Sequence, residues 1–268
     1  MLEIERRPLH LFKVKEIWFS EFPFDVEDCD SVSFKALRNK VDAKGFVREE
    51  HATLVINLTK SLDEIWKAMD KSSCRYAINR AMKDGVKVKR NQNFDDFLNV
   101  YHSFRKRKGL SSFASMFYDP ELEVMKRKYG TLFVAEYDGE ILGGCFFIHD
   151  RENMRWLVGA SRRLEVDKQK ATLIGNANRL IIWEAVKWAK EKGIKEFDLG
   201  GYSIKAEKNP SDPRYGINKF KKSFGGELVK KYFYYKDYSK LIKLARSIYN
   251  ISSLGHMTKR NSLKRGKT

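Results

Sequence analysis

Residues 154–201 read MRWLVGASRRLEVDKQKATLIGNANRLIIWEAVKWAKEKGIKEFDLGG, and this stretch decides the fold. It begins with an apolar run, 154–160, that predicts a β-strand. A helix is expected over about 171–192, because apolar residues recur there at helical spacing and Gly193 follows as the C-terminal glycine. A second apolar run at 196–199 predicts another strand. The stretch therefore predicts a strand–helix–strand unit.

The two strands of this unit predict where a ligand binds. A helical crossover within one sheet makes them parallel, and ligands in open α/β sheets bind beyond the carboxyl ends of such strands. We expect small-residue turns at both ends, Gly159-Ala160-Ser161 and Gly200-Gly201, facing one cleft. Glycine lets a substrate approach the backbone and leaves N–H groups to donate to an oxyanion, as acyl transfer requires. The alternative is that these glycines only end the strands.

The segments on either side of the unit predict the remaining elements of the same domain. The expected elements are a strand at 86–89, helices at about 93–104 and 119–129, strands at 132–137 and 141–148, a helix near 217–223 and a strand at 228–235. Asn93 is the expected cap of the first helix, and Asp119-Pro120 starts the second. Asp138-Gly139 predicts a hairpin between the two strands around it.

Upstream of residue 85 the clearest predicted element is a helix. Ser61-Leu62-Asp63-Glu64 forms a capping box, and apolar spacing continues to Asp84-Gly85, so one helix is expected over this whole range. Short strands are expected within 9–20 and at 32–34 and 53–57. We therefore divide the chain into a truncated N-terminal lobe at 1–84, a main domain at 85–235, and a basic amphipathic helix with a tail at 236–268.

The charge of the chain points to a polyanionic partner. The sequence holds 53 Lys and Arg against 35 Asp and Glu, a net charge of +18. Such an excess attracts nucleic acid, an anionic membrane face or phosphorylated substrates, and a merely basic surface is the alternative. The three cysteines and five histidines show neither disulfide nor metal-ligand spacing, so no metal is expected. Without a signal peptide or a long apolar run, the chain is expected in the cytoplasm.

Four local strings, together with the order of elements from 86 to 235, resemble a known enzyme group. The strings are Cys74-Arg75-Tyr76-Ala77-Ile78-Asn79-Arg80-Ala81, Gly159-Ala160-Ser161, Phe197-Asp198-Leu199-Gly200-Gly201 and Gly216-Ile217-Asn218-Lys219-Phe220-Lys221-Lys222-Ser223-Phe224-Gly225. Over about residues 54–235 the chain resembles the FemABX-type aminoacyltransferases and their acetyltransferase-like relatives. The resemblance implies an α/β fold of the GNAT (acyl-CoA N-acyltransferase) class, with a mixed central sheet flanked by helices and a truncated GNAT-like N-terminal lobe.

The resemblance also implies an activity, which is transfer of an acyl or aminoacyl group to an amine without a bound cofactor or metal. In the peptidoglycan-bridge branch the donor is aminoacyl-tRNA, and the acceptor is the amino group of a cell-wall precursor peptide. A lysine of the Phe-Lys pair is thought to stabilise the oxyanion there, which implies this role for Lys221. Phe220 would then seat the aminoacyl end. The alternative for Lys221 is an exposed lysine within the basic run 219–222.

One departure from the wider superfamily bears on the donor. Coenzyme A-dependent relatives carry a loop of the form Arg/Gln-x-x-Gly-x-Gly/Ala before the long helix, and its N–H groups hold a pyrophosphate. Residues 167–172 read Asp-Lys-Gln-Lys-Ala-Thr instead, without glycine. Acetyl-CoA is therefore the less favoured donor, although Lys168 and Lys170 remain candidates for binding a phosphate by charge alone.

The other candidate residues each have a structural alternative. Asp198 is a candidate base or amine-orienting group, or it hydrogen-bonds its own turn. Tyr202 and Tyr215 are candidate hydrogen-bond donors to a substrate, or aromatic core residues. Arg75 and Arg80 lie about 140° apart on a helix, so one can bind a phosphate while the other pairs with a local acid.

Three functions remain open at this point. The first is a tRNA-dependent aminoacyltransferase that acts by direct aminolysis, with positioning supplying much of the rate. The second is an N-acetyltransferase that uses acyl-CoA. The third is a nucleic-acid or membrane-surface binding module on an inactive transferase fold, in which the basic residues from 236 onward are the functional part. A peripheral contact with the inner, anionic face of the membrane is compatible with the first and third.

Overall fold

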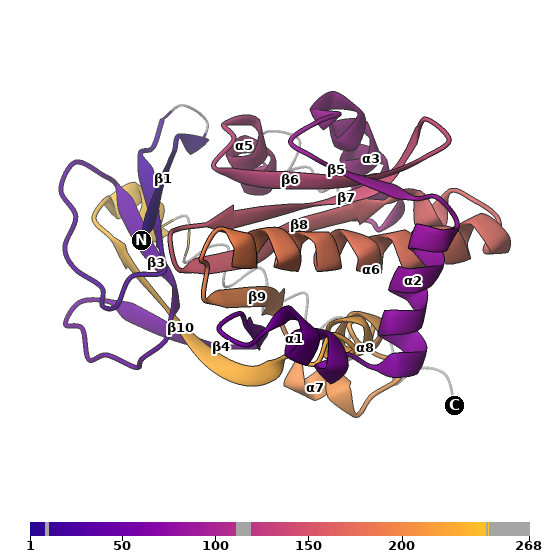
Figure 1. The fold of residues 1–268 in the computed structure, drawn as a ribbon. Coiled ribbons are helices and arrows are strands. Elements are labelled where there is room, and N and C mark those ends of the chain that lie inside the picture. The colour runs from indigo at the N-terminus through magenta and orange to yellow at the C-terminus, as the bar shows by residue number, and fades with distance from the viewer. Residues whose placement is uncertain (9–10, 111–118, 245, 247–268) are drawn as a thin grey trace, which may run out of the picture.

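The fold is built on one mixed sheet of ten strands in the order β1-β2-β3-β10-β4-β9-β8-β7-β6-β5 (Figure 1). The computed structural model describes residues 1–8, 11–110, 119–244 and 246. The strands are β1 Leu2–Arg6, β2 Val14–Trp18, β3 Ser31–Leu37, β4 Val47–Asn57, β5 Lys87–Arg90, β6 Gly130–Tyr137, β7 Glu140–His149, β8 Asn153–Ser161, β9 Glu196–Gly201 and β10 Glu227–Asp237. Only β2–β3 and β8–β9 are parallel pairs among the described strands.

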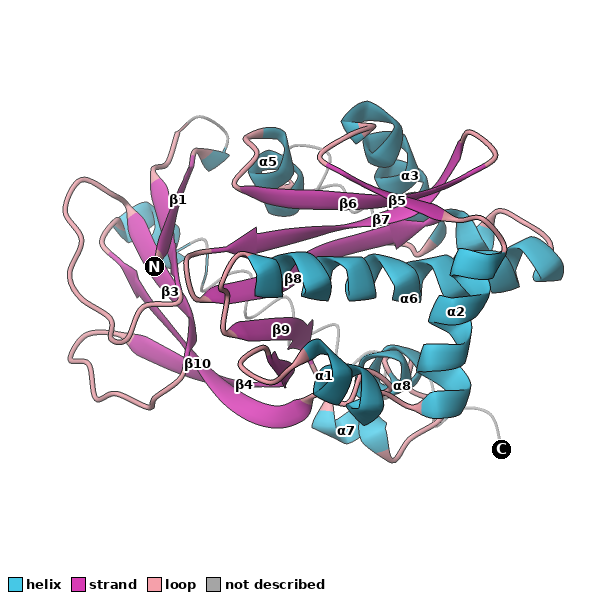
Figure 2. Ribbon diagram, viewed as in Figure 1, coloured by secondary structure: helices cyan, strands magenta, loops and turns pink. Residues whose placement is uncertain are grey.

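Helices flank this sheet (Figure 2). They are α1 Leu62–Ala68, the π-helix η2 Lys71–Arg75, α2 Tyr76–Lys83, α3 Phe94–Arg107, α5 Pro120–Lys126, the 3-10 helix η3 Arg162–Leu164, α6 Lys168–Glu191, α7 Ile204–Glu207 and α8 Tyr215–Lys222. The arrangement confirms the predicted α/β class with a mixed central sheet flanked by helices.

The central strands are buried on both faces, as β7 illustrates. Cys145 and Phe147 belong to the core that contains α1, α2 and α6, whereas Phe146 and Ile148 belong to the core that contains α3 and α5. Successive side chains of a strand point to opposite faces, so an uninterrupted apolar run such as this one requires cover on both sides. The sheet is therefore the middle layer of three, with α6 across one face (Figure 1).

The strand–helix–strand unit that the sequence predicts is confirmed. Strand β8 pairs in parallel with β9 over residues 153–155, and α6 connects the two strands. The hairpin at Asp138-Gly139 is also confirmed, between β6 and β7. Asn93 does precede α3, but its side chain makes no cap bond and donates to Glu136 at 3.1 Å instead.

The single helix expected from residue 61 to residue 84 is wrong, because it is broken at Met69-Asp70. The capping box at its start is present, but Met69 is extended, with ψ 145°. Asp70 then caps η2 by accepting from the N–H of Ser73 at 2.7 Å. Short polar side chains compete with the helix for backbone groups in this way. The break places Asp70 where its N–H donates to the carbonyl of Ser223, at 2.9 Å, just after α8.

Gly225 fixes the approach of the segment after α8 to the end of α1. Its φ is +73°, and a Cβ there would lie 2.3 Å from the carbonyl oxygen of Ala68. We therefore expect Gly225→Ala to lower the free energy of unfolding by about 2–4 kcal/mol, through left-handed strain and the clash together. Urea denaturation measures this, with Gly216→Ala as the control, because a Cβ at Gly216 meets nothing within 4 Å. Equal effects of the two variants would contradict the argument.

The N-terminal strands join the same sheet as the strands of residues 85–235, because β10 lies between β3 and β4. The proposed division into three regions stays a prediction. Strand β1 was not among the expected elements, the first of which lies within 9–20. Of the expected C-terminal helix, residues 240–244 are helical, and the side chain of Arg246 pairs with Asp237. Its remainder and the tail at 247–268 lie outside the described residues.

Candidate active site

The candidate site lies where β8 and β9 separate. The two strands pair only over Asn153–Arg155 and Glu196–Asp198, although β8 continues to Ser161 and β9 to Gly201. The register between β7 and β8 shifts beside Leu157, which is a β-bulge at the point of separation. Bulges bend a strand and commonly stand next to active sites. The result is an opening between two neighbouring strands at the predicted end of the strand–helix–strand unit.

The two predicted glycine turns have different outcomes. The turn at Gly159-Ala160-Ser161 is wrong, because these residues continue β8 and pair with β7. A Cβ at Gly159 would lie 2.5 Å from the ring of Trp156, so this glycine makes room for the indole. Ser161 is buried, and its hydroxyl accepts from the Asn178 amide of α6 at 3.4 Å.

Gly200 forms a bulge inside β9 rather than a turn after it. The pairing with β4 shifts register there, and Gly200 has a φ of +79°. A Cβ at this position would lie 3.1 Å from the carbonyl oxygen of Trp156 and 3.4 Å from Nζ of Lys221. The sequence analysis expected a substrate to approach the backbone closely at this glycine. In the structure the groups that approach Gly200 closely are Trp156 and Lys221. Gly201, the last residue of β9, is exposed.

Lys221 brings a buried ammonium group to the opening. Its side chain is only 8% exposed, and Nζ donates to the carbonyl of Gly201 at 2.8 Å and lies 5.3 Å from the Trp156 ring centre. Burial, together with the nearby charge of Arg155, lowers the pKa of Lys221 to about 8. At neutral pH the group is still mostly protonated, so it is a positive hydrogen-bond donor in a place where water screens little. The alternative of an exposed lysine does not hold for Lys221.

Asp198 stabilises the bulge at Gly200 through hydrogen bonds of its side chain. Its buried carboxylate forms an ion pair with Arg155, and the Thr53 hydroxyl lies within hydrogen-bonding distance of it. The N–H of Gly200 donates to the same carboxylate at 2.7 Å, which confirms that Asp198 hydrogen-bonds its own turn. Both carboxylate oxygens are thus engaged within the protein, which favours a role in positioning the bulge, and the role of Asp198 in proton transfer stays a prediction.

An aromatic wall stands beside Lys221. The ring of Phe220 is half-buried, 6.0 Å from that of Trp156 and 5.2 Å from that of Phe224. The guanidinium of Arg179, from α6, lies 4.9 Å from the Phe220 ring centre. The predicted Phe-Lys pair therefore faces the opening together with a tryptophan and an arginine that the sequence analysis did not select.

Of the two candidate tyrosines, Tyr202 packs in the core as its alternative stated, whereas Tyr215 belongs to no core cluster of the described residues. Tyr202 is buried within the core that contains α6, and its N–H donates to the carbonyl of Ala52 at 2.8 Å. Tyr215 begins α8 and lies 5.7 Å below the ammonium of Lys219, measured to the ring centre. No contact of either tyrosine with Lys221 is present among the described residues, and their predicted role in substrate binding stays a prediction.

The four candidate phosphate-binding cations fall into two pairs. Arg80 forms an exposed ion pair with Asp84, which is the expected structural use, whereas the Nε of half-buried Arg75 has no hydrogen-bond partner within the described part of the chain. Lys170 is ion-paired with Glu140 at 2.5 Å, and Lys168 is exposed. Of these four candidates, Arg75 and Lys168 therefore form no ion pair with an acid in the described structure.

The N-terminus of α6, where coenzyme A-dependent relatives hold a pyrophosphate, is already capped. The carboxylate of Asp167 accepts from the N–H groups of Gln169 and Lys170 at 2.8 and 2.9 Å. These hydrogen bonds lower the pKa of Asp167, so the carboxylate carries its negative charge at neutral pH. A second anion at this position would meet both occupied donors and a like charge.

The site residues that the sequence analysis missed are Thr53, Arg155, Trp156 and Arg179. Arg155 and Trp156 stand inside an apolar run that was read only as a strand, and Thr53 comes from a strand far away in the sequence. A charged residue in the middle of a doubly buried strand was an available signal, because buried charges are paired or functional. The partner of such a residue is not visible in the sequence.

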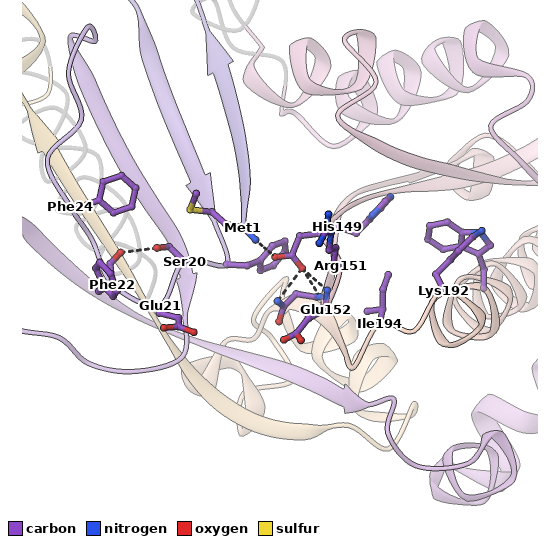
Figure 3. Close-up of a pocket in the computed structure, with 14 residues that line it drawn as sticks. Met1, Ser20, Glu21, Phe22, Phe24, His149, Arg151, Glu152, Lys192 and Ile194 are labelled. Carbon is purple, nitrogen blue, oxygen red and sulfur yellow. Dashed lines mark hydrogen bonds and ion pairs between the residues drawn. The ribbon is translucent and has the colours of Figure 1, made fainter.

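A separate groove lies on the other side of the paired segment of β8 and β9. Its volume is about 1230 Å³, and Met1, Phe22, His149, Arg151 and Ile194 are among the residues that line it. Figure 3 shows that these side chains come from the start of the chain before β1, from the loop after β2, from the end of β7 and the turn before β8, and from the segment after α6. None of the candidate site residues lines this groove.

Comparison with known proteins supports the fold. The acetyltransferase (GNAT) domain family matches residues 71–221, more than half of the chain, and the chain belongs to this family. It is a transferase of the GNAT acyltransferase type, and the match spans the opening, Trp156 and Lys221.

Solved structures resemble the chain at low sequence identity. FemX aligns with a TM-score of 0.58 at 16% identity, covering 78% of this chain and 72% of that one. The C-terminal domain of a putative lysylphosphatidylglycerol synthetase from Agrobacterium fabrum gives 0.54 at 11%, covering 94% and 83%. L-PGS from Bacillus licheniformis gives 0.51 at 14%, covering 80% and 70%. At these identities the likeness concerns the fold. A search of curated proteins finds no match.

The described residues were also compared with the requirements of a membrane-spanning helix and of a metal site. No helix in them combines the length and the apolar character that crossing a membrane requires. No group of three or more His, Cys, Asp or Glu side chains within them is arranged to hold a metal ion.

Proposed function

We propose that this acyltransferase moves an aminoacyl group from aminoacyl-tRNA to an amine, with Lys221 stabilising the oxyanion. The observation that carries the proposal is the buried ammonium of Lys221 at the opening between β8 and β9, beside the Gly200 bulge and the Trp156 ring. A preorganised positive donor in a dry site is the feature that acyl transfer uses most.

The chemistry that this geometry supports is direct aminolysis. The neutral amine of the acceptor attacks the carbonyl carbon of the donor ester, and the tetrahedral intermediate carries a negative oxygen. Lys221 donates one N–H to Gly201 and has two further N–H groups for that oxygen. As the carbonyl re-forms, the C–O bond of the ester breaks while the new C–N bond remains. The proton lost by the amine passes to the departing ester oxygen, which becomes a hydroxyl group. Phe220 and Trp156 form the apolar wall that excludes water.

Two observations favour an RNA-borne donor over acyl-CoA. The cap that Asp167 places on α6 occupies the helix terminus that would hold a coenzyme A pyrophosphate. The net charge of +18 provides a strong attractive field for tRNA. In addition, one structure of the same fold is a putative lysylphosphatidylglycerol synthetase, whose name describes an aminoacylated product.

For the acceptor, we propose an amine-bearing cell-wall precursor, as the resemblance to the peptidoglycan-bridge enzymes implies. Such precursors are presented at the inner face of the membrane, so peripheral contact of a basic protein with that anionic surface belongs to the same proposal. The proposed location is the cytoplasm.

A second candidate function is N-acetyl transfer from acyl-CoA, because the family that matches is described as an acetyltransferase domain. It shares Lys221 and the opening with the first and differs only in the donor.

The donor is tested by the melting temperature of the protein with acetyl-CoA, uncharged tRNA and aminoacyl-tRNA at physiological salt. Ligands that bind only the folded state raise this temperature by mass action. We expect aminoacyl-tRNA to give a larger rise than uncharged tRNA, and acetyl-CoA to give none. A rise with acetyl-CoA alone would overturn the aminoacyl-tRNA proposal in favour of the second candidate. Equal rises with both tRNAs would reduce the interaction to polyanion binding and contradict the proposal.

A further inference from the structure

Two arginine side chains meet over one glycine of α6. The Arg179 guanidinium donates to the carbonyl of Gly175 at 3.1 Å. The Arg163 guanidinium, from η3, lies over the other side of the same residue, with its Cζ 3.7 Å from the position that a Cβ of Gly175 would take. A Cβ there would make only ordinary van der Waals contact with this guanidinium, so Arg163 packs directly against α6 at Gly175. Two positive groups, one from η3 and one from α6, therefore lie close to the same residue.

Neither of these arginines has an acidic partner in the described structure. The Nε of Arg179 is buried without a hydrogen-bond partner, and no ion pair forms at either residue within the described ranges. Burial lowers the pKa of Arg179, and the neighbouring charge of Arg163 contributes in the same direction. Asp70 is an acid near Arg179, but its carboxylate accepts from Ser72 and Ser73. Two like charges kept together without a counterion are typical of a site whose counterion is a ligand.

The arginine pair borders the candidate active site. Arg179 stacks on Phe220, the residue before Lys221, and Phe220 in turn contacts Trp156 at the opening. The pair is separate from the capped N-terminus of α6, because Gly175 and Arg179 stand two and three turns further along that helix. An anion bound by the pair would therefore belong to a molecule whose reactive end reaches Lys221.

We infer that Arg163 and Arg179, converging on Gly175, form a subsite for a phosphate group of the acyl donor. Guanidinium groups match phosphate oxygens through paired N–H donors, and two of them on different elements fix both position and orientation. This inference rests on the proposed function for the placement of the donor. The phosphate chemistry itself is shared by the backbone of RNA and by coenzyme A.

The test compares Arg163→Gln and Arg179→Lys with the unaltered protein and with Arg151→Gln. Arg163 is exposed, so its substitution leaves the core intact. Arg179→Lys keeps the positive charge but removes the paired N–H donors of the guanidinium group. Arg151 is an exposed arginine at the opposite end of β8 and serves as the matched control. Two probes are used, each titrated at several salt concentrations. One is an RNA hairpin that ends in the 3′ sequence of tRNA and carries no amino acid, and the other is coenzyme A.

We expect Arg163→Gln and Arg179→Lys each to weaken binding of the hairpin about tenfold, the loss of one charge-assisted contact. Arg163→Gln should also reduce the dependence of the binding constant on salt by slightly less than one counterion, and Arg151→Gln should change neither quantity. Unchanged hairpin and coenzyme A affinities in both site variants would overturn the subsite while leaving the proposed function standing. Weaker coenzyme A binding, with no hairpin binding by any form, would support the subsite and reject the proposed RNA donor.

Discussion

Replacing Lys221 with methionine should lower the transfer rate about 100-fold or more and, at pH 7, raise the free energy of unfolding by about 1–3 kcal/mol. The rate falls because methionine cannot donate to the oxyanion. The stability rises because the folded protein at pH 7 keeps a charged group that burial disfavours, as the pKa of about 8 shows. A lysine that served stability alone would give the opposite sign in the second measurement, so the pair of readouts separates function from structure.

The gain in stability has a defined pH window. Between about pH 8 and the usual lysine pKa of 10.5, the unfolded chain retains a proton that folded Lys221 has released. The stability of the unaltered protein therefore rises with pH across this window. The advantage of Lys221→Met is complete below about pH 8 and disappears toward pH 10.5. Urea denaturation of both proteins at pH 7 and at pH 10 measures this difference.

Lys222 is the matched control for this experiment. It is the next residue in the chain, but it is exposed and pairs with Glu207 at 2.9 Å. Lys222→Met should change stability by less than about 1 kcal/mol and should leave the rate of transfer nearly unchanged. Equal loss of activity in the two variants, or a Lys221→Met protein that is less stable at pH 7, would contradict the role given to Lys221.

Asp198→Ala should lower the free energy of unfolding by about 3–5 kcal/mol. The substitution leaves the guanidinium of Arg155, itself only 9% exposed, without its counterion. It also removes the acceptor of the Gly200 N–H, so the bulge that receives Lys221 loses its support. Activity should fall together with stability, because Gly201 and Lys221 depend on the bulge. Urea denaturation and steady-state kinetics at a temperature well below the melting point measure the two effects.

A double variant shows whether the buried charge is the cause. Arg155→Met combined with Asp198→Leu removes both charges, and apolar pairs of similar volume often replace buried ion pairs at little cost. The double variant should therefore be more stable than Asp198→Ala alone, while its activity stays low because the bulge still lacks its acceptor. If the double variant is less stable than Asp198→Ala, the unpaired charge of Arg155 is not the cause of the stability that Asp198→Ala loses.

Local signals in the sequence were sufficient for much of the fold. The strand–helix–strand unit, the Asp138-Gly139 hairpin and the capping box at Ser61 were predicted correctly, because each rests on spacing or turn chemistry within a few residues. The break at Met69-Asp70 was not predicted, since apolar spacing continues across it; the cap that Asp70 makes on η2 and its contact with Ser223 both favour the interruption. Likewise, Gly159-Ala160-Ser161 resembles a turn locally but pairs with β7 in the sheet.

The sequence by itself determined the class of enzyme and the strand–helix–strand unit, and it predicted a site at one end of this unit with Lys221 as its central residue. Only the tertiary structure decided which lysine of 219–222 is buried, because Lys221 and Lys222 are chemically identical and differ only in the face of α8 that they occupy. It also decided that Asp198 holds Arg155 and Thr53, from strands that adjoin β9 in the sheet. Such pairings join residues that are distant along the chain, and the local patterns of one sequence do not indicate which distant residues become neighbours.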